Sequence, residues 1–303
     1  MTSRRLEFPV GPELAGQTVR TLLRRELELS GTVLRRVKWL EDGILLDGAR
    51  VSVRAVVQAG QLLSVRVGDT EVKSEILPVP GPLDLVYEDE DLVVLNKASG
   101  VPVHPGPGHY DDTIGNFLLA YYETSGVLAD FHPVHRLDKG TSGLLVVAKH
   151  AHAQDQLRCQ LHTDQFRRTY LAVCEGVPDP PAGVVDAPLG RVPESLIQQE
   201  VRPDGLPART HYETLASVQG RALLRLVLET GRTHQIRVHM AYIGHPLTGD
   251  FLYGTEAPEV IPRPALHSAE LSFRHPVTKE QMTFSQPMPE DMRRLLEQEM
   301  DFI

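Results

Sequence analysis

The stretch His135-Arg136-Leu137-Asp138-Lys139-Gly140-Thr141-Ser142-Gly143 runs directly into the apolar segment 144–149. Asp138 is its only acid, and a glycine-rich turn before a strand presents such a side chain at the end of a sheet. The neighbouring cations Arg136 and Lys139 favour the ionised carboxylate, whereas burial opposes it. This pattern is typical of a nucleophile or a general base. The alternative is that Asp138 only caps the turn, because Asp is a common turn residue.

Further motifs surround this stretch in a fixed order. They are Val93-Val94-Leu95-Asn96-Lys97 with the segment 100–105, then Arg168-Thr169-Tyr170-Leu171-Ala172, then 231–239 with 244–250, and finally 266–269 with 273–276. Taken together with 135–143, they resemble the signature of the RluA-type family of RNA pseudouridine synthases, over most of the chain after residue 83. The resemblance implies an enzyme that isomerises uridine to pseudouridine in RNA, without a cofactor or a metal.

The resemblance also implies roles for individual side chains. Asp138 matches the essential catalytic aspartate of the family, and Arg237 matches the arginine that pairs with it. Tyr170 matches the aromatic residue that packs against the target uracil, and its hydroxyl is a candidate to handle the C5 proton. Arg136 matches the arginine that fills the space left by the flipped base, and Leu266 matches an apolar pocket wall. On pattern alone, Tyr170 and Leu266 are equally compatible with plain core, and Arg237 with a helix surface.

Composition limits the class of protein. A chain of 303 residues suits two domains, and 41% hydrophobic residues suffice for a substantial core. No apolar stretch reaches the roughly 18 residues of a membrane span, and the N-terminus lacks an apolar signal region. With only two cysteines, a disulfide scaffold is not expected. We therefore expect a cytoplasmic protein that does not enter a membrane.

The net charge of −9 does not by itself favour a polyanionic partner, but the charges are unevenly distributed. Residues 1–75 carry 12 Lys/Arg and 10 Asp/Glu. Helical spacing of apolar residues from Val19 onward, a cap at Ser30 and short strands at 44–46, 51–53 and 62–67 resemble an S-four-like RNA-binding domain. Arg35, Arg36 and Lys38 are expected to face outward and contact RNA phosphates. The alternative is an ordinary solvated helix face.

The proline-rich segment 76–83 predicts an extended linker, so the expected domains are 1–75 and 84–303. In the second domain, strands and helices do not strictly alternate, which favours an α+β fold over a doubly wound sheet. The resemblance implies a mostly antiparallel, bent mixed sheet with flanking helices. A helix is expected near 117–122 and another near 151–161, with strands at 83–87, 92–95, 143–149, 169–173 and 222–228.

Other chemistries are less well supported. The pairs His132 with His135 and His234 with His239 lack the companions of a metal site. A carboxylate-dependent glycosidase would need a second acid near Asp138. A non-catalytic RNA-binding or ribosome-assembly protein on the same fold is the remaining alternative. We expect a monomer whose partner is ribosomal or transfer RNA, and the sequence does not distinguish between these two targets.

Overall fold

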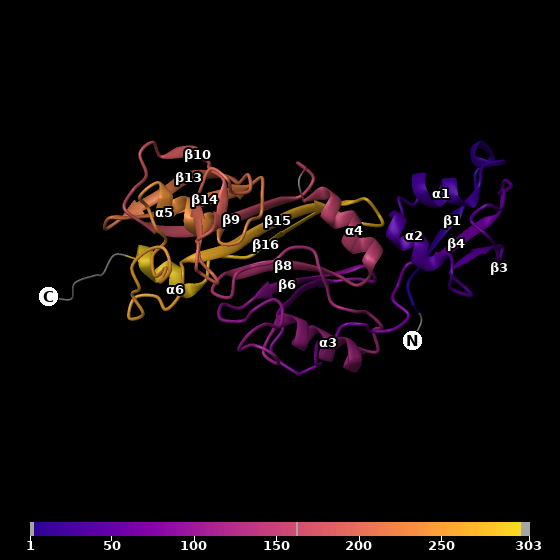
Figure 1. Cartoon of the computed structure of the whole chain (residues 1–303), viewed down its shortest axis with the longest axis horizontal. Helices are drawn as coiled ribbons and strands as arrows, with labels where there is room; N and C mark the ends of the chain where they lie inside the picture. Colours follow the sequence, from indigo (N-terminus) through magenta and orange to yellow (C-terminus); the bar gives the residue numbers. More distant parts are fainter. Residues whose placement is uncertain (1–2, 162, 298–303) are drawn as a thin grey trace.

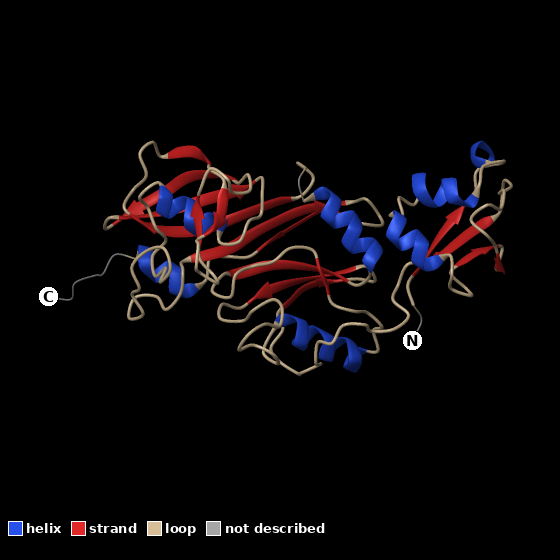
Figure 2. Ribbon diagram, in the orientation of Figure 1, coloured by secondary structure: helices blue, strands red, loops and turns tan. Residues whose placement is uncertain are grey.

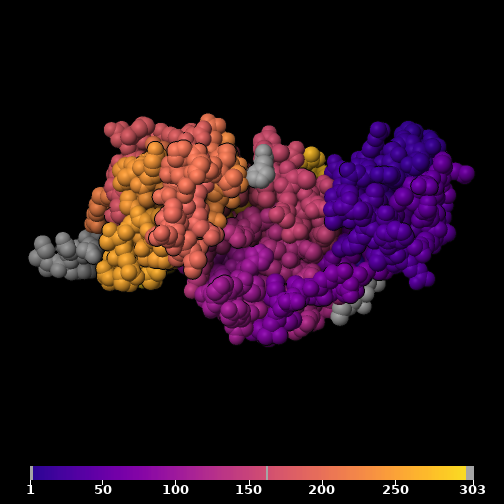
Figure 3. Space-filling model, viewed as in Figure 1, coloured from indigo at the N-terminus to yellow at the C-terminus, as the bar shows by residue number. Residues whose placement is uncertain are grey.

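Two sheets organise the chain (Figures 1 and 2). In the computed structural model, which describes residues 3–161 and 163–297, four strands near the N-terminus form one sheet and ten later strands form another. The ends of the two predicted domains, 1–2 and 298–303, lie outside the described residues. The N-terminal unit forms a lobe at one end of the molecule, next to its middle part (indigo in Figure 3). Within the described residues, no helix combines the length and apolar character needed to cross a membrane.

The N-terminal unit has its own apolar core, built from both helices and the sheet. Its elements are β1 (Arg5–Pro9), η1 (Pro12–Leu14), α1 (Val19–Arg25), α2 (Gly31–Val37), β2 (Ile44–Leu46), β3 (Ala49–Arg50) and β4 (Leu62–Arg66), with the strand order β1-β4-β2-β3. The hydroxyl of Thr18 caps α1, and that of Ser30 caps α2 as predicted. The strand predicted at 51–53 is wrong. Asp47 and Gly48 both have positive φ and form a two-residue hairpin turn, which places the strand at Ala49–Arg50.

One predicted RNA-binding side chain of α2 does not face outward. Arg36 is half-buried, and its guanidinium donates to Asp69 Oδ1 at 3.0 Å and to the Val67 carbonyl at 2.7 Å. Asp69 in turn accepts a hydrogen bond from His132 of the large sheet. The prediction that Arg36 faces outward is wrong. Its partner Asp69 lies 33 residues away along the chain, so local sequence does not indicate the contact. Arg35 and Lys38 are exposed as expected.

The ten-stranded sheet follows the order β10-β13-β14-β9-β15-β8-β6-β5, with β16 beside β15 and β7 beside β8. Its strands are β5 (Leu85–Glu88), β6 (Leu92–Lys97), β7 (His132–Pro133), β8 (Ser142–Ala148), β9 (Arg167–Glu175), β10 (Ala182–Asp186), β13 (Arg209–Val218), β14 (Arg221–Leu228), β15 (Leu266–Arg274) and β16 (Gln281–Ser285). Only the short β15–β8 pairing is parallel. The predicted α+β class and the largely antiparallel sheet are therefore confirmed.

Helices and a small ribbon flank this sheet. They are α3 (Ile114–Ser125), α4 (Ala151–Gln160), α5 (Gln235–Tyr242), α6 (Glu290–Arg293), η2 (Arg294–Leu296) and the pair β11 (Leu189–Arg191) and β12 (Gln199–Val201). Figure 1 shows α4 between the large sheet and the N-terminal unit, where Ser30 hydrogen bonds to Asp155. The sequence predicted α3 and α4, but it missed β10 to β13.

The proline-rich segment 76–82 has no regular secondary structure, and it is held along α3. Asn116 donates from Nδ2 to the Leu77 carbonyl at 2.8 Å, and its own carbonyl accepts from the Val79 amide at 3.1 Å. Ile76 packs against the apolar core of the large sheet. The segment is thus extended, but it is fixed to the surface of the second unit.

Gly143 sets the close approach of β8 to β15. Its φ is +105°, and a Cβ atom there would lie 2.3 Å from the Ser268 carbonyl oxygen. Only glycine accommodates both conditions without displacement. The loop that carries Asp138 is therefore brought directly against β15, which also carries Leu266.

Candidate active site

Asp138 lies in the loop between β7 and β8. Its carbonyl accepts from the Thr141 amide at 3.0 Å, and the next carbonyl, of Lys139, accepts from the Gly100 amide at 2.8 Å. These backbone contacts fix the loop without using the Asp138 carboxylate, whose side chain is 25% exposed. The turn therefore presents the carboxylate, as the sequence pattern predicted.

A cavity of about 280 Å³ opens beside this carboxylate. Its walls include all five predicted pocket residues, namely Arg136, Asp138, Tyr170, Arg237 and Leu266. They come from the β7–β8 loop, β9, α5 and β15, which the sheet order brings together. The volume is near the lower end of the ~300–1,000 Å³ typical of small-ligand sites. The cavity is thus of a size for one small, partly apolar group.

Arg237 contacts two carboxylates, Asp250 closely and Asp138 at a longer distance. Its Nε and one terminal nitrogen donate to the two oxygens of Asp250, both at 2.7 Å, whereas its other terminal nitrogen lies 3.8 Å from Asp138 Oδ2. Burial is the largest single influence and lowers the pKa of Arg237, but the hydrogen bonds to Asp250 and the negative charges of Asp250 and Asp138 together raise it more, so the pKa lies above its ordinary value. Arg237 is therefore a permanent cation that faces Asp138 while Asp250 holds it.

Lys97, at the end of β6, is a second cation near Asp138. Its ammonium group is buried and donates to the carbonyls of Ala98 and Val101 at 2.8 Å and of Lys139 at 3.2 Å. Burial lowers the pKa of Lys97 to about 7, and the charge of Asp138 opposes that shift. Lys97 thus connects the end of β6 to the loop that carries Asp138.

The two cations near Asp138 in the sequence, Arg136 and Lys139, make their contacts with other residues. Lys139 Nζ lies 3.0 Å from His109 Nε2, and the exposed Arg136 donates weakly to Thr233 Oγ1 at 3.4 Å. We expected Arg136 and Lys139 to stabilise the ionised Asp138, but the nearest ion-pair partner is Arg237. Arg136 instead lies at the rim of the cavity.

Tyr170 and Leu266 form the apolar wall. Their strands β9 and β15 are neighbours, with Tyr170 opposite Ser268 and Leu266 opposite Ala172. Both side chains are buried, and burial raises the pKa of Tyr170. The phenol therefore stays neutral at physiological pH and offers a flat apolar face.

Comparison with known proteins connects this cavity to a reaction. The family model described as RNA pseudouridylate synthase matches residues 91–242, which include Asp138, Tyr170 and Arg237. The "Uncharacterized RNA pseudouridine synthase YjbO" of Bacillus subtilis is 43% identical over 274 residues, which cover 90% of this chain and 96% of that protein. The chain belongs to the RNA pseudouridine synthase family. It is an isomerase that converts uridine to pseudouridine in RNA.

Other relatives of the synthase agree. "Ribosomal large subunit pseudouridine synthase D" of Escherichia coli (strain K12) is 40% identical over 278 residues, covering 86% of this chain and 85% of that protein. The solved structure titled "Human RNA Pseudouridylate Synthase Domain Containing 4" superposes with a TM-score of 0.56 at 26% identity. It covers 69% of this chain and 90% of that one. The fold and the reaction class predicted from the sequence are confirmed.

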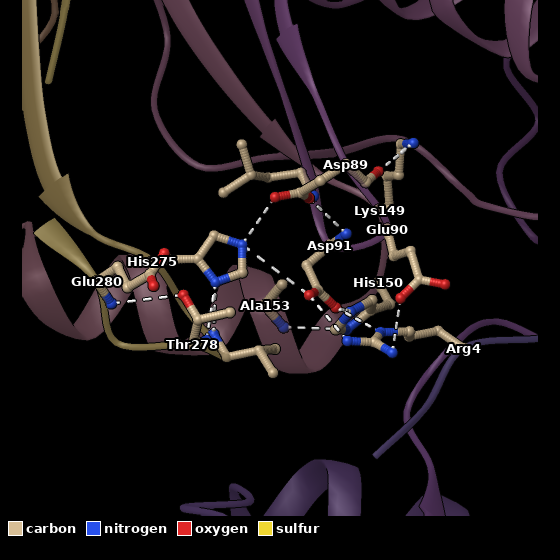
Figure 4. A network of polar contacts seen from close by, with 12 residues as sticks. Arg4, Asp89, Glu90, Asp91, Lys149, His150, Ala153, His275, Thr278 and Glu280 are labelled. Carbon is tan, nitrogen blue, oxygen red and sulfur yellow. Dashed lines mark hydrogen bonds and ion pairs between the residues drawn. The ribbon is translucent and has the colours of Figure 1, made fainter. Parts of the chain in front are cut away.

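A second cluster of charged groups in the synthase has a different character (Figure 4). Asp91 Oδ1 accepts from Arg4 Nε and from His150 Nε2, both at 2.9 Å. Asp89 Oδ2 accepts from His275 Nε2, also at 2.9 Å. Hydrogen bonding by His150 and Arg4 holds the pKa of Asp91 far below its usual range despite its burial. This network, Arg4–Asp89–Asp91–His150–His275, joins the N-terminal unit to the large sheet, and we call it the interdomain network.

Asp89, Asp91 and His275 are close enough to bind one metal ion, but their hydrogen bonds already use the ligand atoms. His275 Nδ1 accepts from the amides of Val277 and Thr278, so the ring proton is on Nε2 and is donated to Asp89. A metal would have to displace that proton. The cluster is better explained as hydrogen-bonded structure.

The histidines considered as ligands are also committed to hydrogen bonds. His132 contacts Asp69, His234 contacts the Tyr253 hydroxyl at 2.8 Å, and His239 contacts Thr210 and the Ala187 carbonyl. His135 Nε2 accepts from the Val146 amide at 3.4 Å. They hold loops and strands together.

Lys97, Asp250 and Arg168 occur in the family motifs, but the sequence alone assigned them no role. Two signals were available for the first two. Lys97 ends a strand that begins with four apolar residues, and Asp250 follows Gly249 in a tight turn. Neither signal states which partner the charge meets, because those partners are distant in the chain.

Proposed function

We propose that this enzyme isomerises uridine in large-subunit ribosomal RNA and that Asp138 is its essential carboxylate. The ribosomal target is supported by the names of the relatives from Escherichia coli and from Nitrosomonas europaea, which are both ribosomal large subunit pseudouridine synthases D. Transfer RNA is the other target that the sequence leaves open.

One observation carries the role of Asp138: among the described residues that line the cavity, it is the only carboxylic acid. Breaking the bond between uracil N1 and C1′ of the ribose requires a carboxylate near the sugar, either to form a bond to C1′ or to remove a proton from C2′. Asp138 serves either route. A two-carboxylate glycosidase mechanism has no second acid on these walls.

The neighbouring residues have distinct roles in this proposal. Arg237 places a positive charge 3.8 Å from the Asp138 carboxylate, and Asp250 fixes the guanidinium. Tyr170 and Leu266 pack against the uracil and retain it after it is detached. Because its pKa is raised, Tyr170 accepts the C5 proton only by passing its own proton onward. Arg136, at the rim, fills the space in the RNA that the extruded base leaves.

The N-terminal unit, predicted as 1–75, is proposed to position the RNA. Arg35 and Lys38 are exposed on and after α2, where they would contact phosphates without reading sequence. Arg36 is omitted from this role because it pairs with Asp69. A monomeric state, a cytoplasmic location and independence of cofactors stay predictions.

The test is a map of pseudouridine in cellular RNA with and without the gene for this protein. We expect specific positions in large-subunit ribosomal RNA to revert to uridine. Wild-type protein should restore them, and the Asp138→Asn variant should not. Loss confined to transfer RNA would overturn the ribosomal target. No change in any RNA, with no tritium release from C5-tritiated RNA in vitro, would favour the non-catalytic alternative.

A further inference from the structure

Arg168 is a buried cation in the wall of the catalytic cavity, and the roles described above do not use it. It lies on β9 two residues before Tyr170, so both side chains project from the same face of the strand. Only 5% of Arg168 is exposed, and it lines the same cavity as Asp138. Its neighbour Arg167 is exposed on the opposite face.

The charge of Arg168 is not compensated by any of the residues that the structure describes. Its guanidinium makes one long hydrogen bond, from a terminal nitrogen to the Thr230 carbonyl at 3.4 Å, and its buried Nε has no partner. Among residues 3–161 and 163–297, no carboxylate oxygen lies within 4.0 Å of its nitrogens. By contrast, the buried guanidinium groups of Arg237 and Arg263 each bind a carboxylate bidentately. A buried cation without a counter-charge is costly.

The backbone beside Arg168 is shaped to accept the guanidinium. A Cβ atom at Gly231 would lie 2.7 Å from a terminal nitrogen of Arg168, so that glycine leaves room for the charged group. Gly231 begins the turn that leads into α5 and Arg237. The cation is therefore seated at a defined place on the wall, between the Gly231 turn and Tyr170.

We propose that Arg168 is an anion subsite of the catalytic cavity and that the extruded uridine nucleotide supplies its missing counter-charge. This inference rests on the proposed function, because it requires uridine in this cavity. The planar guanidinium, with its free donors, suits an oxyanion better than an ammonium group does.

Two groups of the nucleotide provide negative charge there. A phosphate flanking the uridine is charged throughout the reaction. The uracil becomes an anion when the N1–C1′ bond breaks, since the electron pair of that bond passes to the ring and spreads over N1, O2 and O4. Formation of the C5–C1′ bond consumes the charge, and Asp138 returns to its starting state. The C5 proton then leaves to a base and N1 takes up a proton, which gives neutral pseudouridine.

The experiment compares Arg168→Gln, Arg168→Lys and the matched control Arg167→Gln. The substrate is a transcript of the large-subunit RNA segment whose uridine the cellular map identifies. We expect the single-turnover rate to fall about 100-fold in Arg168→Gln, as for loss of one preorganised charge-stabilising donor. Arg168→Lys should recover part of the rate, and Arg167→Gln should match the wild type. The melting temperature of Arg168→Gln should be unchanged or higher, because an unpaired buried charge has been removed.

Two further substrates separate the sources of charge. With 5-fluorouridine at the target position, the uracil is a better leaving anion, so the deficit of Arg168→Gln in consuming that nucleoside should shrink if the charge is on uracil. With a neutral methylphosphonate beside the target, the wild type should fall to the rate of Arg168→Gln if the charge is on phosphate. Either result supports the subsite.

A wild-type rate for Arg168→Gln would overturn the subsite. So would a lowered melting temperature together with equal inactivity of the Lys and Gln variants, since that combination describes a structural arginine. Inactivity of the wild-type protein on every RNA contradicts the proposed function instead, so the two failures are distinguishable.

Discussion

Two carboxylates of this synthase, the buried Asp91 and the half-buried Asp138, have opposite surroundings. Asp91 is 3% exposed, and three donor groups from Arg4 and His150 occupy its oxygens. Asp138 has a 25% exposed side chain, and its closest ion-pair partner is Arg237 at 3.8 Å. A carboxylate with saturated hydrogen bonds has little capacity to react, because its lone pairs are already engaged. This contrast supports the proposal that Asp138 acts in the reaction and that Asp91 stabilises the structure.

The same contrast separates the cations. Arg4 and Arg36 bind carboxylates at the junction between the N-terminal unit and the large sheet. Arg168 has no counter-charge among the described residues, and Lys97 is held only by carbonyl groups. The charges of Arg4 and Arg36 are thus neutralised by carboxylates, whereas that of Arg168, on the cavity wall, is available to a ligand.

The Asp138→Asn substitution tests the reactive side of this comparison. We expect a loss of at least about 10⁴-fold in the single-turnover rate, the scale seen when an essential catalytic group is removed. The melting temperature and the RNA affinity should stay near wild-type values, because the Asp138 carboxylate supports little of the structure. Tritium release from C5-tritiated RNA measures the rate. Turnover at the wild-type rate would remove Asp138 from the mechanism.

The Asp250→Ala substitution removes a carboxylate near the cavity whose two oxygens both accept hydrogen bonds from Arg237. It leaves the guanidinium of Arg237 buried without its partner, so the free energy of unfolding should fall by about 3–5 kcal/mol. Urea denaturation measures this change. The control is Asp204→Ala, which breaks an exposed pair with Arg202 and should leave the urea midpoint nearly unchanged. Equal midpoints for the two variants would show that the Arg237–Asp250 pair is not structural.

The Asp91→Asn substitution tests the structural side. Losing charge-assisted hydrogen bonds should lower the free energy of unfolding by about 2 kcal/mol at neutral pH, while turnover per folded molecule persists. The pKa of Asp91 is lowered in the folded protein, so its contribution is present above the unfolded pKa of about 3.9 and is lost as pH falls through the folded value. Denaturation between pH 3 and 7 should therefore show a shallower acid decline in Asp91→Asn. Loss of turnover in a folded variant would instead make Asp91 catalytic.

The exposed cations of the N-terminal unit should give the smallest effect. Replacing Arg35 and Lys38 together by Gln should reduce the slope of log affinity against log salt by about 1.5, since two phosphate contacts are lost. Arg36→Gln should instead lower the melting temperature, because it leaves Asp69 with fewer partners. Filter binding over a salt series measures the slope. An unaltered slope in the double variant would return this face to ordinary solvated surface.

The sequence by itself determined the local features of this protein. The caps at Thr18 and Ser30, the helices α3 and α4, and the Asp138 turn before an apolar strand follow from short-range preferences. The family motifs also identified the reaction, because they contain the pocket residues and follow one another in the order typical of the family.

Only the tertiary structure decided how the charges are paired. The partner of Arg36 lies 33 residues away, and that of Arg4 lies 87 residues away. Asp250 takes the main hydrogen bonds of an arginine that the sequence assigned to Asp138. Such pairings depend on sheet order and on the contact between the two units, which bring distant residues within a few ångströms. Local periodicity carries no information about those distances, so the sequence could name the reactive groups but not their counter-charges.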